Sequence, residues 1–291
     1  MLRLVSFLVV AGVAACTTAP PTVVPPPAAS AAPVAARDSL RPEWNAVFRA
    51  YNAEGVFVLY EPEAGVIHRS DATRAGERRT PASTFKVYNA LVALETGVVR
   101  DPDSMFVWDG TRRWLDAWNR DHSLRTGMEF STVWLYQRVA ERVGAERYRA
   151  AFVREPYGNG AVGDSVTTFW LTGPLAISPD EQVAFMDRLR RGDLAFRPEV
   201  QATVRDLLVS YREAGGTIHG KTGWAVEPDE SDLGWLVGWV ERSRPHPQGR
   251  GTVAVFAMNV TRSVGQDFDL GAARRVIVRS LLTTEDWLDA L

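Results

Sequence analysis

The stretch Pro81-Ala82-Ser83-Thr84-Phe85-Lys86 decides how the fold of this 291-residue chain is predicted. It contains the motif Ser-x-x-Lys, and apolar residues recur after it at helical spacing until Gly97. On a helix, Ser83 and Lys86 lie one turn apart on the same face, and the helix N-terminus favours negative charge at the hydroxyl. A buried lysine with a lowered pKa can act as the base that a serine nucleophile needs. By itself the motif also fits a serine that caps a helix and a lysine on the surface.

A second motif, His219-Gly220-Lys221-Thr222-Gly223, falls on a predicted strand about 135 residues after the first. Its small residues allow a ligand to lie against the strand edge, while Lys221 supplies a positive charge and Thr222 a hydroxyl group. Among the 33 basic residues only Lys86 and Lys221 are lysines, so lysine occurs only inside the two motifs, where an amine that can lose its proton is useful. Together the motifs predict a penicillin-recognising serine acyltransferase.

The second motif also matches a phosphate-binding loop, because Gly215, Gly220, Lys221 and Thr222 satisfy the pattern Gly-x-x-x-x-Gly-Lys-Thr. Such a loop follows a strand and opens a helix. Here a predicted helix comes before the motif, and Trp224 begins a segment that leads into an acidic loop. The order of elements therefore disfavours a nucleotide site.

Composition excludes several other classes of protein. Hydrophobic residues make up 46% of the chain and charged residues 23%, and the net charge of -2 gives no reason to expect nucleic acid as a partner. The one cysteine, Cys16, lies near the N-terminus, so the folded part has no disulfide, thiolate metal site or cysteine nucleophile. The four histidines lack the spacing of metal ligands, and we expect no metal. They are His68, His122, His219 and His246.

The first part of the chain has the pattern of an export signal. Arg3 precedes an apolar run that ends Val13-Ala14-Ala15-Cys16, and this run is shorter than the roughly 20 residues of a membrane-spanning helix. A cysteine after small residues is typical of a bacterial lipoprotein, in which Cys16 carries lipid; an ordinary signal cut after Ala15 is the alternative. Residues 17–37 are rich in alanine and proline and predict an extended tether.

These features predict a signal over residues 1–16 and a folded domain over 38–291. We expect the protein in the periplasm or cell envelope, where a lipid on Cys16 is its only contact with a membrane.

The folded part contains segments with the residue spacing of helices and segments with the pattern of strands. Helical spacing recurs over residues 40–51, from 83 to Gly97, and over 131–143, 178–191, 200–211 and 269–282. Ser178 and Glu181 form a capping box, with Pro179 at the first helical position. Strand patterns cover residues 56–60, 66–68, 217–222, 234–241 and 252–260. Strands at both ends of the chain predict an α/β (α+β) fold, with a central antiparallel sheet of about five strands, helices on its faces and a helical insert over about 100–210.

Further short motifs in a fixed order make the chain similar to the class D (oxacillinase-type) serine β-lactamases, from about Leu40 to the C-terminus. Ser131-Thr132-Val133 matches the Ser-x-Val of that family, and Tyr157-Gly158-Asn159 matches its Tyr-Gly-Asn. Three more stretches fall in the family's order; they are Trp108-Asp109-Gly110, Trp118-Asn119 with Asp121, and Phe169-Trp170-Leu171. The resemblance implies the β-lactamase/transpeptidase fold and hydrolysis of the β-lactam amide bond, which confers resistance.

The resemblance also implies which residue acts as the base that activates water in deacylation. The chain has no Glu-x-x-Leu-Asn segment, which supplies the deacylation base of class A enzymes. In class D enzymes the lysine of Ser-x-x-Lys reacts with CO2 and becomes N6-carboxylated, so bicarbonate is needed and no other cofactor is expected. Phe85, Val133, Trp170 and Leu171 are expected to surround Lys86 with apolar surface, and the Trp170 N–H to bind the carbamate. A tryptophan that only fills the core is the alternative.

Other site residues are carried over from the same family. Ser83 attacks the lactam carbonyl, the backbone N–H groups of Ser83 and Trp224 form the oxyanion hole, and Ser131 relays the proton to the leaving nitrogen. Lys221 and Thr222 hold the substrate carboxylate. The expected substrate-binding residues on the Lys-Thr-Gly and Ser-x-Val segments are Lys221, Thr222, Gly223, Trp224 and Val133.

The chain departs from the family at the arginine that binds the substrate carboxylate. Alignment on Phe256-Ala257-Met258-Asn259 places Gly271 at that position, near the start of the last helix. Arg274 or Arg275, one turn further on, is expected to take its place, and Arg262 after the last strand is the other candidate. Each of the three also fits an arginine on the surface.

Two other functions share many of these motifs. A penicillin-sensing or penicillin-binding domain keeps the acyl group on its serine, and a cell-wall DD-peptidase acts on D-Ala-D-Ala peptides and has Ser-x-Asn. The lipoprotein-like signal and Val133 favour the hydrolase. The expected partner is a small β-lactam and not nucleic acid, and the chain is expected to be a monomer or a homodimer. Penicillins are the expected substrates; oxacillins, cephalosporins and carbapenems stay open.

Overall fold

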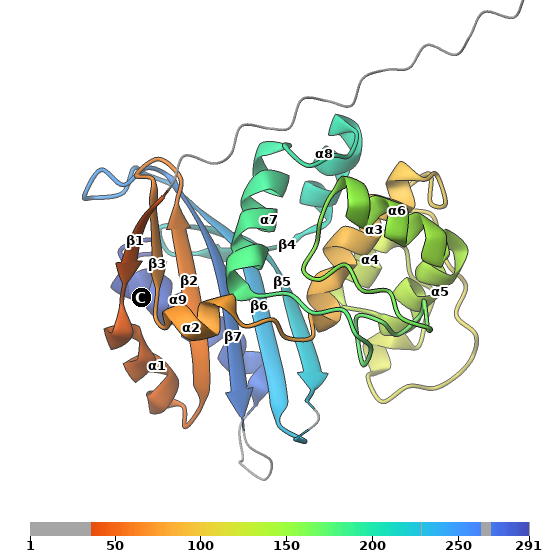
Figure 1. Ribbon diagram of the computed structural model, residues 1–291, viewed down its shortest axis with the longest axis horizontal. Helices are drawn as coiled ribbons and strands as arrows, with labels where there is room; N and C mark the ends of the chain where they lie inside the picture. Colours follow the sequence, from red (N-terminus) through yellow and green to blue (C-terminus); the bar gives the residue numbers. More distant parts are fainter. Residues whose placement is uncertain (1–35, 228, 263–268, 291) are drawn as a thin grey trace, which may run out of the picture. The chain divides into compact units, whose positions relative to one another are not determined.

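Within residues 36–227, 229–262 and 269–290, which the computed structural model describes, seven strands form one sheet in the order β1-β3-β2-β7-β6-β5-β4 (Figure 1). The strands are β1 (Arg37–Leu40), β2 (Glu54–Glu61), β3 (Val66–Arg69), β4 (Val209–Glu213), β5 (Gly216–Val226), β6 (Asp232–Arg242) and β7 (Val253–Arg262). Neighbouring strands are antiparallel except β1 and β3, which run parallel. Because β2 pairs with β7, the sheet is assembled from both ends of the chain, as the sequence predicts.

Both faces of the sheet are covered, because its residues alternate between two hydrophobic cores. In β2, Val56 and Val58 belong to one core, whereas Phe57 and Leu59 belong to the other. Helix α7 (Pro179–Arg191) packs on the first face, and α1 (Asn45–Ala50) and α9 (Leu270–Thr284) pack on the second. Burial on both faces explains why the central strands are hydrophobic almost throughout.

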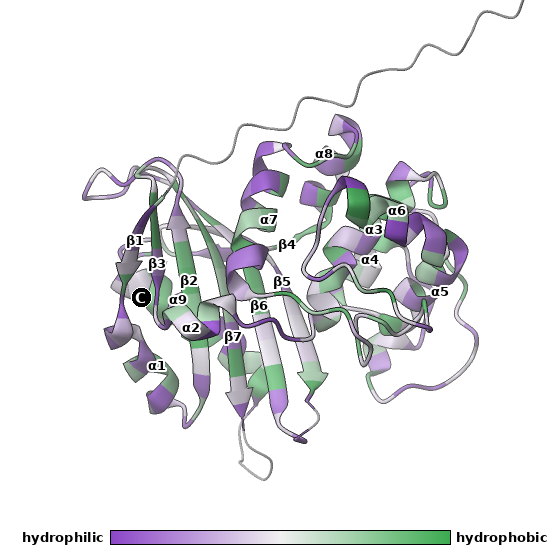
Figure 2. Cartoon of the chain, viewed as in Figure 1, coloured by the Kyte–Doolittle hydropathy of each residue, from purple (hydrophilic) through white to green (hydrophobic). Residues whose placement is uncertain are grey.

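The other helices gather beside the β4–β5 end of the sheet (Figure 1). They are α3 (Lys86–Glu95), α4 (Leu124–Glu129), α5 (Val133–Val143), α6 (Ala145–Arg154) and α8 (Pro198–Leu207); the exception is α2 (Ala72–Gly76), which contacts β2 and α7. Helix α3 is the centre of this group, since every residue from Lys86 to Leu94 is buried. Figure 2 shows the amphipathic helices around it, in which hydrophilic and hydrophobic residues alternate along the ribbon.

The capping box predicted at the start of α7 is confirmed. Ser178 Oγ accepts a hydrogen bond from the backbone N–H of Glu181 (3.2 Å), and the Glu181 carboxylate accepts one from the N–H of Ser178 (2.9 Å). Gly192, with φ +78°, ends the helix in the left-handed conformation. These local signals fix the two ends of α7, and its packing on β2, β6 and β7 places it next to the segment that carries Ser83.

The structure corrects several predicted boundaries. The sheet has seven strands rather than about five, because β1 and β4 add its two edges. The helix predicted over 200–211 ends at Leu207, since from Val209 the chain pairs with β5. The helix predicted over 40–51 starts only after Leu40, which still belongs to β1, with the 3-10 turn η1 (Pro42–Trp44).

The helices at the two predicted serines also start later than expected. A 3-10 turn, η2 (Ala82–Phe85), carries Ser83, and α3 begins at Lys86. The helix after Ser131 begins at Val133. Another 3-10 turn, η3 (Asp116–Trp118), lies in the loop before α4.

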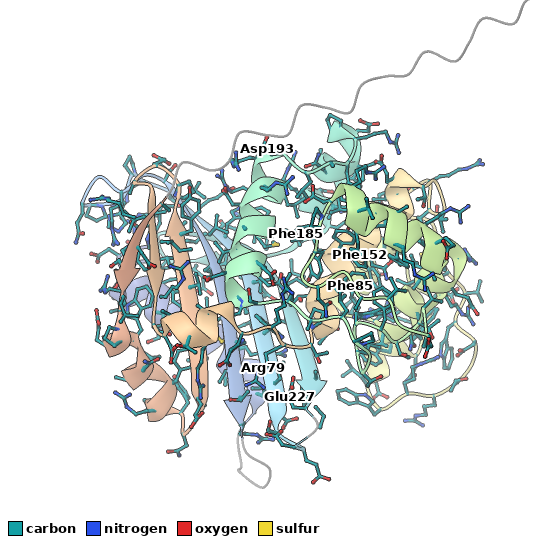
Figure 3. All side chains as sticks on the ribbon, viewed as in Figure 1. Arg79, Phe85, Phe152, Phe185, Asp193 and Glu227 are labelled. Carbon is teal, nitrogen blue, oxygen red and sulfur yellow. The ribbon has the colours of Figure 1, made fainter. Side chains whose placement is uncertain are left out.

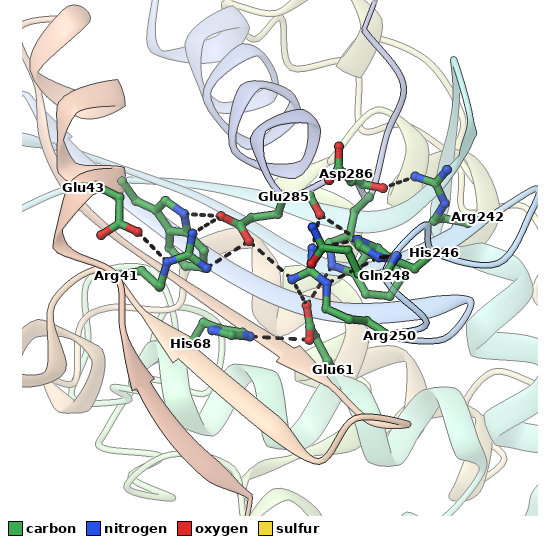
Figure 4. A network of polar contacts seen from close by, with 12 residues as sticks. Arg41, Glu43, Glu61, His68, Arg242, His246, Gln248, Arg250, Glu285 and Asp286 are labelled. Atoms are coloured by element: carbon green, nitrogen blue, oxygen red, sulfur yellow. Dashed lines mark hydrogen bonds and ion pairs between the residues drawn. The ribbon is translucent and has the colours of Figure 1, made fainter.

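A buried polar network holds both ends of the domain against the sheet (Figure 4). Glu285, after α9, accepts hydrogen bonds from the guanidinium of Arg41 (2.6 and 3.0 Å) and from Trp44 Nε1 (2.8 Å). Glu61, at the end of β2, accepts one from Arg250 (2.6 Å). Both carboxylates are buried, and such charges are tolerated only when they are paired in this way.

The predicted export signal, Cys16 and nearly all of the tether lie outside the described residues. In the described part of the chain, no helix combines the length and the apolar character that crossing a bilayer requires. Over the same residues, no three His, Cys, Asp or Glu side chains gather as a metal-binding group.

Candidate active site

Ser83 and Lys86 lie side by side at the junction of η2 and α3. Lys86 Nζ is 2.6 Å from Ser83 Oγ, and the Lys86 side chain is completely buried. Burial lowers the pKa of Lys86 from 10.5 to about 7, because an apolar environment disfavours the charged amine. Near neutral pH a large share of this amine is therefore uncharged and can accept the proton of Ser83.

Aromatic side chains pack around Lys86 and its neighbour Phe85. Its Nζ lies 5.5 Å from the ring centre of Tyr136 on α5. Phe85 packs 5.4 Å from the ring of Trp170 and 6.3 Å from Phe152, which Figure 3 shows beside it in the helical half. Trp170 Nε1 is buried and has no hydrogen-bond partner among the described residues. Because an unsatisfied buried N–H is costly, this donor favours the binding of an acceptor.

The other two predicted lining residues are less buried than Trp170. Val133 is the first residue of α5 and is partly buried, and Leu171 packs partly buried against the same core.

Ser131 and Lys221 connect the helical half to the sheet. Lys221, buried in β5, donates hydrogen bonds to Ser131 Oγ (2.9 Å) and to the Thr222 carbonyl (2.9 Å). Burial lowers the pKa of Lys221 well below 10.5, and the positive charges of Lys86 and Arg274 lower it further. Ser131 has φ +54°, a strained conformation for a residue with a side chain. The two predicted motifs and Ser-x-Val thus meet at one place.

Gly223 allows β5 to lie directly against the turn that carries Ser83. A Cβ atom at Gly223 would lie 3.1 Å from the Pro81 carbonyl oxygen and 3.2 Å from Thr84 Cγ2. The next residue, Trp224, is half exposed, and its Nε1 donates to Asp232 (2.8 Å). Since Gly220, Lys221 and Thr222 lie inside the continuous strand β5, no helix follows them as a phosphate-binding loop requires.

The three candidate arginines have different surroundings. Arg274 is buried, and its guanidinium donates to the carbonyl oxygens of Gly223 and Leu270, the latter at 3.0 Å. Arg275 is exposed and lies over the ring of Tyr211, and Arg262 is paired with Asp232 (2.6 Å). Arg274 thus contacts the Lys-Thr-Gly segment directly. A Cβ at Gly234 would clash with its side chain at 2.9 Å, so a glycine in β6 makes room for it.

The Tyr-Gly-Asn motif holds the loop that carries Trp170. Asn159 donates from Nδ2 to the Pro174 carbonyl (2.8 Å), and its Oδ1 accepts from the N–H of Ala176 (3.0 Å). A Cβ at Gly158, which has φ +54°, would lie 2.1 Å from the Ala176 oxygen. Only glycine fits at this position, so the chain at Gly158 can approach Ala176 closely and the two ends of the loop lie side by side.

The stretches around Trp108 and Trp118 support Ser131. The N–H of Trp108 donates to Asp121 (2.8 Å), which closes this long loop. Trp118 Nε1 donates to the carbonyl of Phe130 (2.8 Å), the residue before Ser131. The second contact holds the backbone of the residue next to Ser131.

Tyr136 is a site residue that was not predicted from the sequence, although its ring lies over the amine of Lys86. Tyr136 lies one turn after Val133, and from the sequence this spacing indicated only that it belongs to the apolar face of the helix. Tertiary packing of α3 against α5 brings it to the site.

The fold and the site define a serine acyltransferase of the penicillin-recognising superfamily. The family described as the penicillin-binding protein transpeptidase domain matches residues 55–279. The chain is 36% identical over 245 residues to the β-lactamase OXA-15 of Pseudomonas aeruginosa, covering 83% of this chain and 85% of that one. It is 34% identical over 242 residues to OXA-48 of Klebsiella pneumoniae, covering 83% and 87%.

Solved structures agree with these relatives. FUS-1 (OXA-85), a class D β-lactamase from Fusobacterium nucleatum subsp. polymorphum, matches with a TM-score of 0.78 and 33% identity, covering 86% of this chain and 100% of that one. The chain belongs to the class D β-lactamases, serine hydrolases that act on the cyclic amide of β-lactam antibiotics and confer resistance. The predicted family, fold class and enzyme class are confirmed.

Proposed function

We propose that the chain hydrolyses β-lactams through an ester on Ser83, and that Lys86 is the base in both halves of the reaction. One observation carries this proposal: Lys86 Nζ lies 2.6 Å from Ser83 Oγ in full burial, with a pKa of about 7. A charged lysine is a poor base, whereas the buried neutral amine can take a proton or react with CO2.

The surroundings of Lys86 fit a carbamate. The amine is neutral in a large share of molecules, its environment is apolar, and Trp170 Nε1 is a buried donor with no partner in the described part of the chain. Carboxylation would supply an anionic base at the end of the Lys86 side chain. Trp170 would hold it, with Phe85 and Tyr136 excluding water.

In acylation, Ser83 Oγ forms a bond to the lactam carbonyl carbon while its proton passes to the base at Lys86. The C–N bond of the ring then breaks, and Ser131 gives its hydroxyl proton to the leaving nitrogen. Lys221, 2.9 Å from Ser131 Oγ, holds that hydroxyl and stabilises its ionised form. The proton that the base at Lys86 took from Ser83 then passes to Ser131, which restores its hydroxyl and frees the base for deacylation.

The backbone N–H groups of Ser83 and Trp224 stabilise the negative charge on the carbonyl oxygen. Gly223 supports this role, because it lets β5 approach the Ser83 turn closely. In deacylation, Lys86 takes a proton from water and the water oxygen bonds to the ester carbon. The bond between that carbon and Ser83 Oγ then breaks, and Lys86 returns the proton to Ser83 as the product leaves.

The substrate carboxylate is bound between β5 and α9. Lys221 and Thr222 lie on β5, and Arg274 brings a buried positive charge to the Gly223 carbonyl. We propose Arg274, rather than Arg275 or Arg262, as the arginine that replaces the one absent at Gly271. Val133 and Trp224 would line the space for the rest of the substrate.

We further propose penicillins as substrates, and lipidation of Cys16 as the anchor in the cell envelope. The lipid is tested by the mass of the mature N-terminus and by membrane fractionation of a Cys16→Ser variant. Release of that variant from membranes supports the anchor, and unchanged fractionation contradicts it.

The first experiment is hydrolysis of a chromogenic cephalosporin in excess, with and without added bicarbonate. Sustained turnover that bicarbonate increases supports a hydrolase with carboxylated Lys86. A single stoichiometric burst contradicts it, because the acyl group then stays on Ser83 as in a penicillin sensor or a penicillin-binding protein.

A further inference from the structure

A buried chain of three polar side chains lies directly behind the turn that carries Ser83. Gln182 on α7 donates from Nε2 to Thr84 Oγ1 (2.8 Å) and to the hydroxyl of Tyr157 (3.3 Å). Thr84 Oγ1 in turn donates to the carbonyl of Pro81 (2.7 Å). All three side chains are 1% exposed, and the mechanism above gives none of them a role.

The turn that this chain holds is strained. Ala82, immediately before Ser83, has φ +49°. Such a conformation costs about 1–3 kcal/mol and persists only where the surrounding structure imposes it. Thr84 closes the turn around Ala82 twice, because its backbone N–H (3.1 Å) and its hydroxyl (2.7 Å) both donate to the Pro81 carbonyl.

The same threonine faces the strand on the other side of the site. Its Cγ2 atom lies 3.2 Å from where a Cβ of Gly223 would be, and the Pro81 oxygen lies 3.1 Å from that point. Thr84 and the Pro81 carbonyl therefore form the surface on which Gly223 rests. Trp224, the next residue along β5, supplies one N–H of the oxyanion hole, and Ser83 supplies the other.

We propose that Gln182 and Thr84 are positioning residues, which set the distance and direction between the backbone N–H groups of Ser83 and Trp224. Tyr157 accepts the second hydrogen bond from Gln182 Nε2 (3.3 Å), which assigns a role to the tyrosine of the Tyr-Gly-Asn motif. This inference rests on the proposed Ser83 acyl-enzyme. Because the negative oxygen forms in both halves of the reaction, a displaced oxyanion hole slows acylation and deacylation together.

The test compares Thr84→Val, which keeps the shape but loses the hydroxyl, with Thr84→Ser, which keeps the hydroxyl. Acylation is followed as the mass gain on Ser83 after rapid quenching, and deacylation as loss of that mass. We expect Thr84→Val and Gln182→Leu to slow both steps about tenfold, with KM changed less than about twofold. Thr84→Ser should stay within about threefold of the unmodified chain, and the response to bicarbonate should not change.

Gln201→Leu is the matched control. Gln201 is equally buried and bonds the backbone of Leu194 (2.9 and 3.0 Å) and Phe196 (2.7 Å) near α8, away from the site. It should lower the melting temperature as Gln182→Leu does, without lowering kcat. Equal kcat losses in both variants, or slowing of deacylation alone, would overturn the proposal. If the unmodified chain is acylated but does not turn over, the proposed hydrolysis fails, and the acylation rates still test the positioning role.

Discussion

Lys221 Nζ and Ser131 Oγ, 90 residues apart in the chain, lie 2.9 Å from each other between the sheet and the helical half. Lys221 is fixed in a central position of β5, whereas Ser131 is held in a strained turn before α5. Their contact joins the two halves of the site and connects the proton relay to the group proposed to bind the substrate carboxylate.

Replacing Ser131 should therefore impair protonation of the leaving nitrogen. For Ser131→Ala we expect acylation to slow by about 10²–10⁴-fold, the usual contribution of a general acid, with little change in substrate binding. Rapid-quench mass spectrometry measures the acylation rate. The neighbouring variant Thr132→Ser serves as a control for loop integrity, and a normal acylation rate in Ser131→Ala would exclude the relay.

Replacing Lys86 should separate the two half-reactions. Lys86→Ala removes the base 2.6 Å from Ser83 Oγ, so the ester forms slowly and then remains on the enzyme. Mass spectrometry of the intact protein should show one acyl group per chain that persists for hours. Fast turnover by Lys86→Ala would remove Lys86 from the mechanism. Ser83→Ala is the matched control and should show no acyl group.

The rate should rise with pH through the pKa of Lys86. Burial places this pKa near 7 in the folded chain, and below it the amine is protonated and can neither accept a proton nor react with CO2. At limiting bicarbonate, kcat is expected to increase between about pH 6 and 8, and added bicarbonate should shift the rise to lower pH. A kcat that is flat over this range contradicts the assignment.

Trp170→Phe tests the indole N–H that has no hydrogen-bond partner among the described residues. It keeps an aromatic ring against Phe85 but removes the buried donor. Loss of a hydrogen bond to a charged acceptor costs about 1.5–3 kcal/mol, so the bicarbonate concentration for half-maximal activity should rise about 10-fold or more. Bicarbonate titration of turnover measures this. An unchanged titration would show that Trp170 only fills the core.

The two adjacent arginines give a direct comparison. Arg274→Ala should raise KM by about 10–100-fold for substrates with a free carboxylate, since a charge-assisted contact is lost. Arg275→Ala should have little effect, because its guanidinium lies over Tyr211 on the surface. A cephalosporin ester, which lacks the carboxylate, should be insensitive to both variants. A KM increase confined to Arg275→Ala would reverse the assignment.

Features that depend on neighbours along the chain were predictable from the sequence. The Ser178 capping box was predicted correctly. The helix predicted from Ser83 and the strand that carries Lys221 both exist, with ends displaced by a few residues, because each depends on local hydrogen bonds or on periodic burial. The order of the short motifs also identified the family.

The edge strands could not be predicted in this way. Residues 209–213 continue a helical pattern, and they become β4 because β5 offers a free edge on which they pair. In the same way, β1 exists because Arg37 to Leu40 pair with β3. A strand forms its hydrogen bonds with a neighbouring strand, so the presence of that neighbour can override the conformation that the local sequence favours.

The sequence by itself determined which residues could do the chemistry: a serine with a lysine one turn away, a Lys-Thr-Gly strand, and several arginines. Only the tertiary structure decided which arginine reaches β5, that Tyr136 covers Lys86, and that Gln182 reaches Thr84 from α7. The physical reason is burial. The pKa of Lys86 and the position of each partner arise from side chains brought together by packing, which no local pattern in the chain encodes.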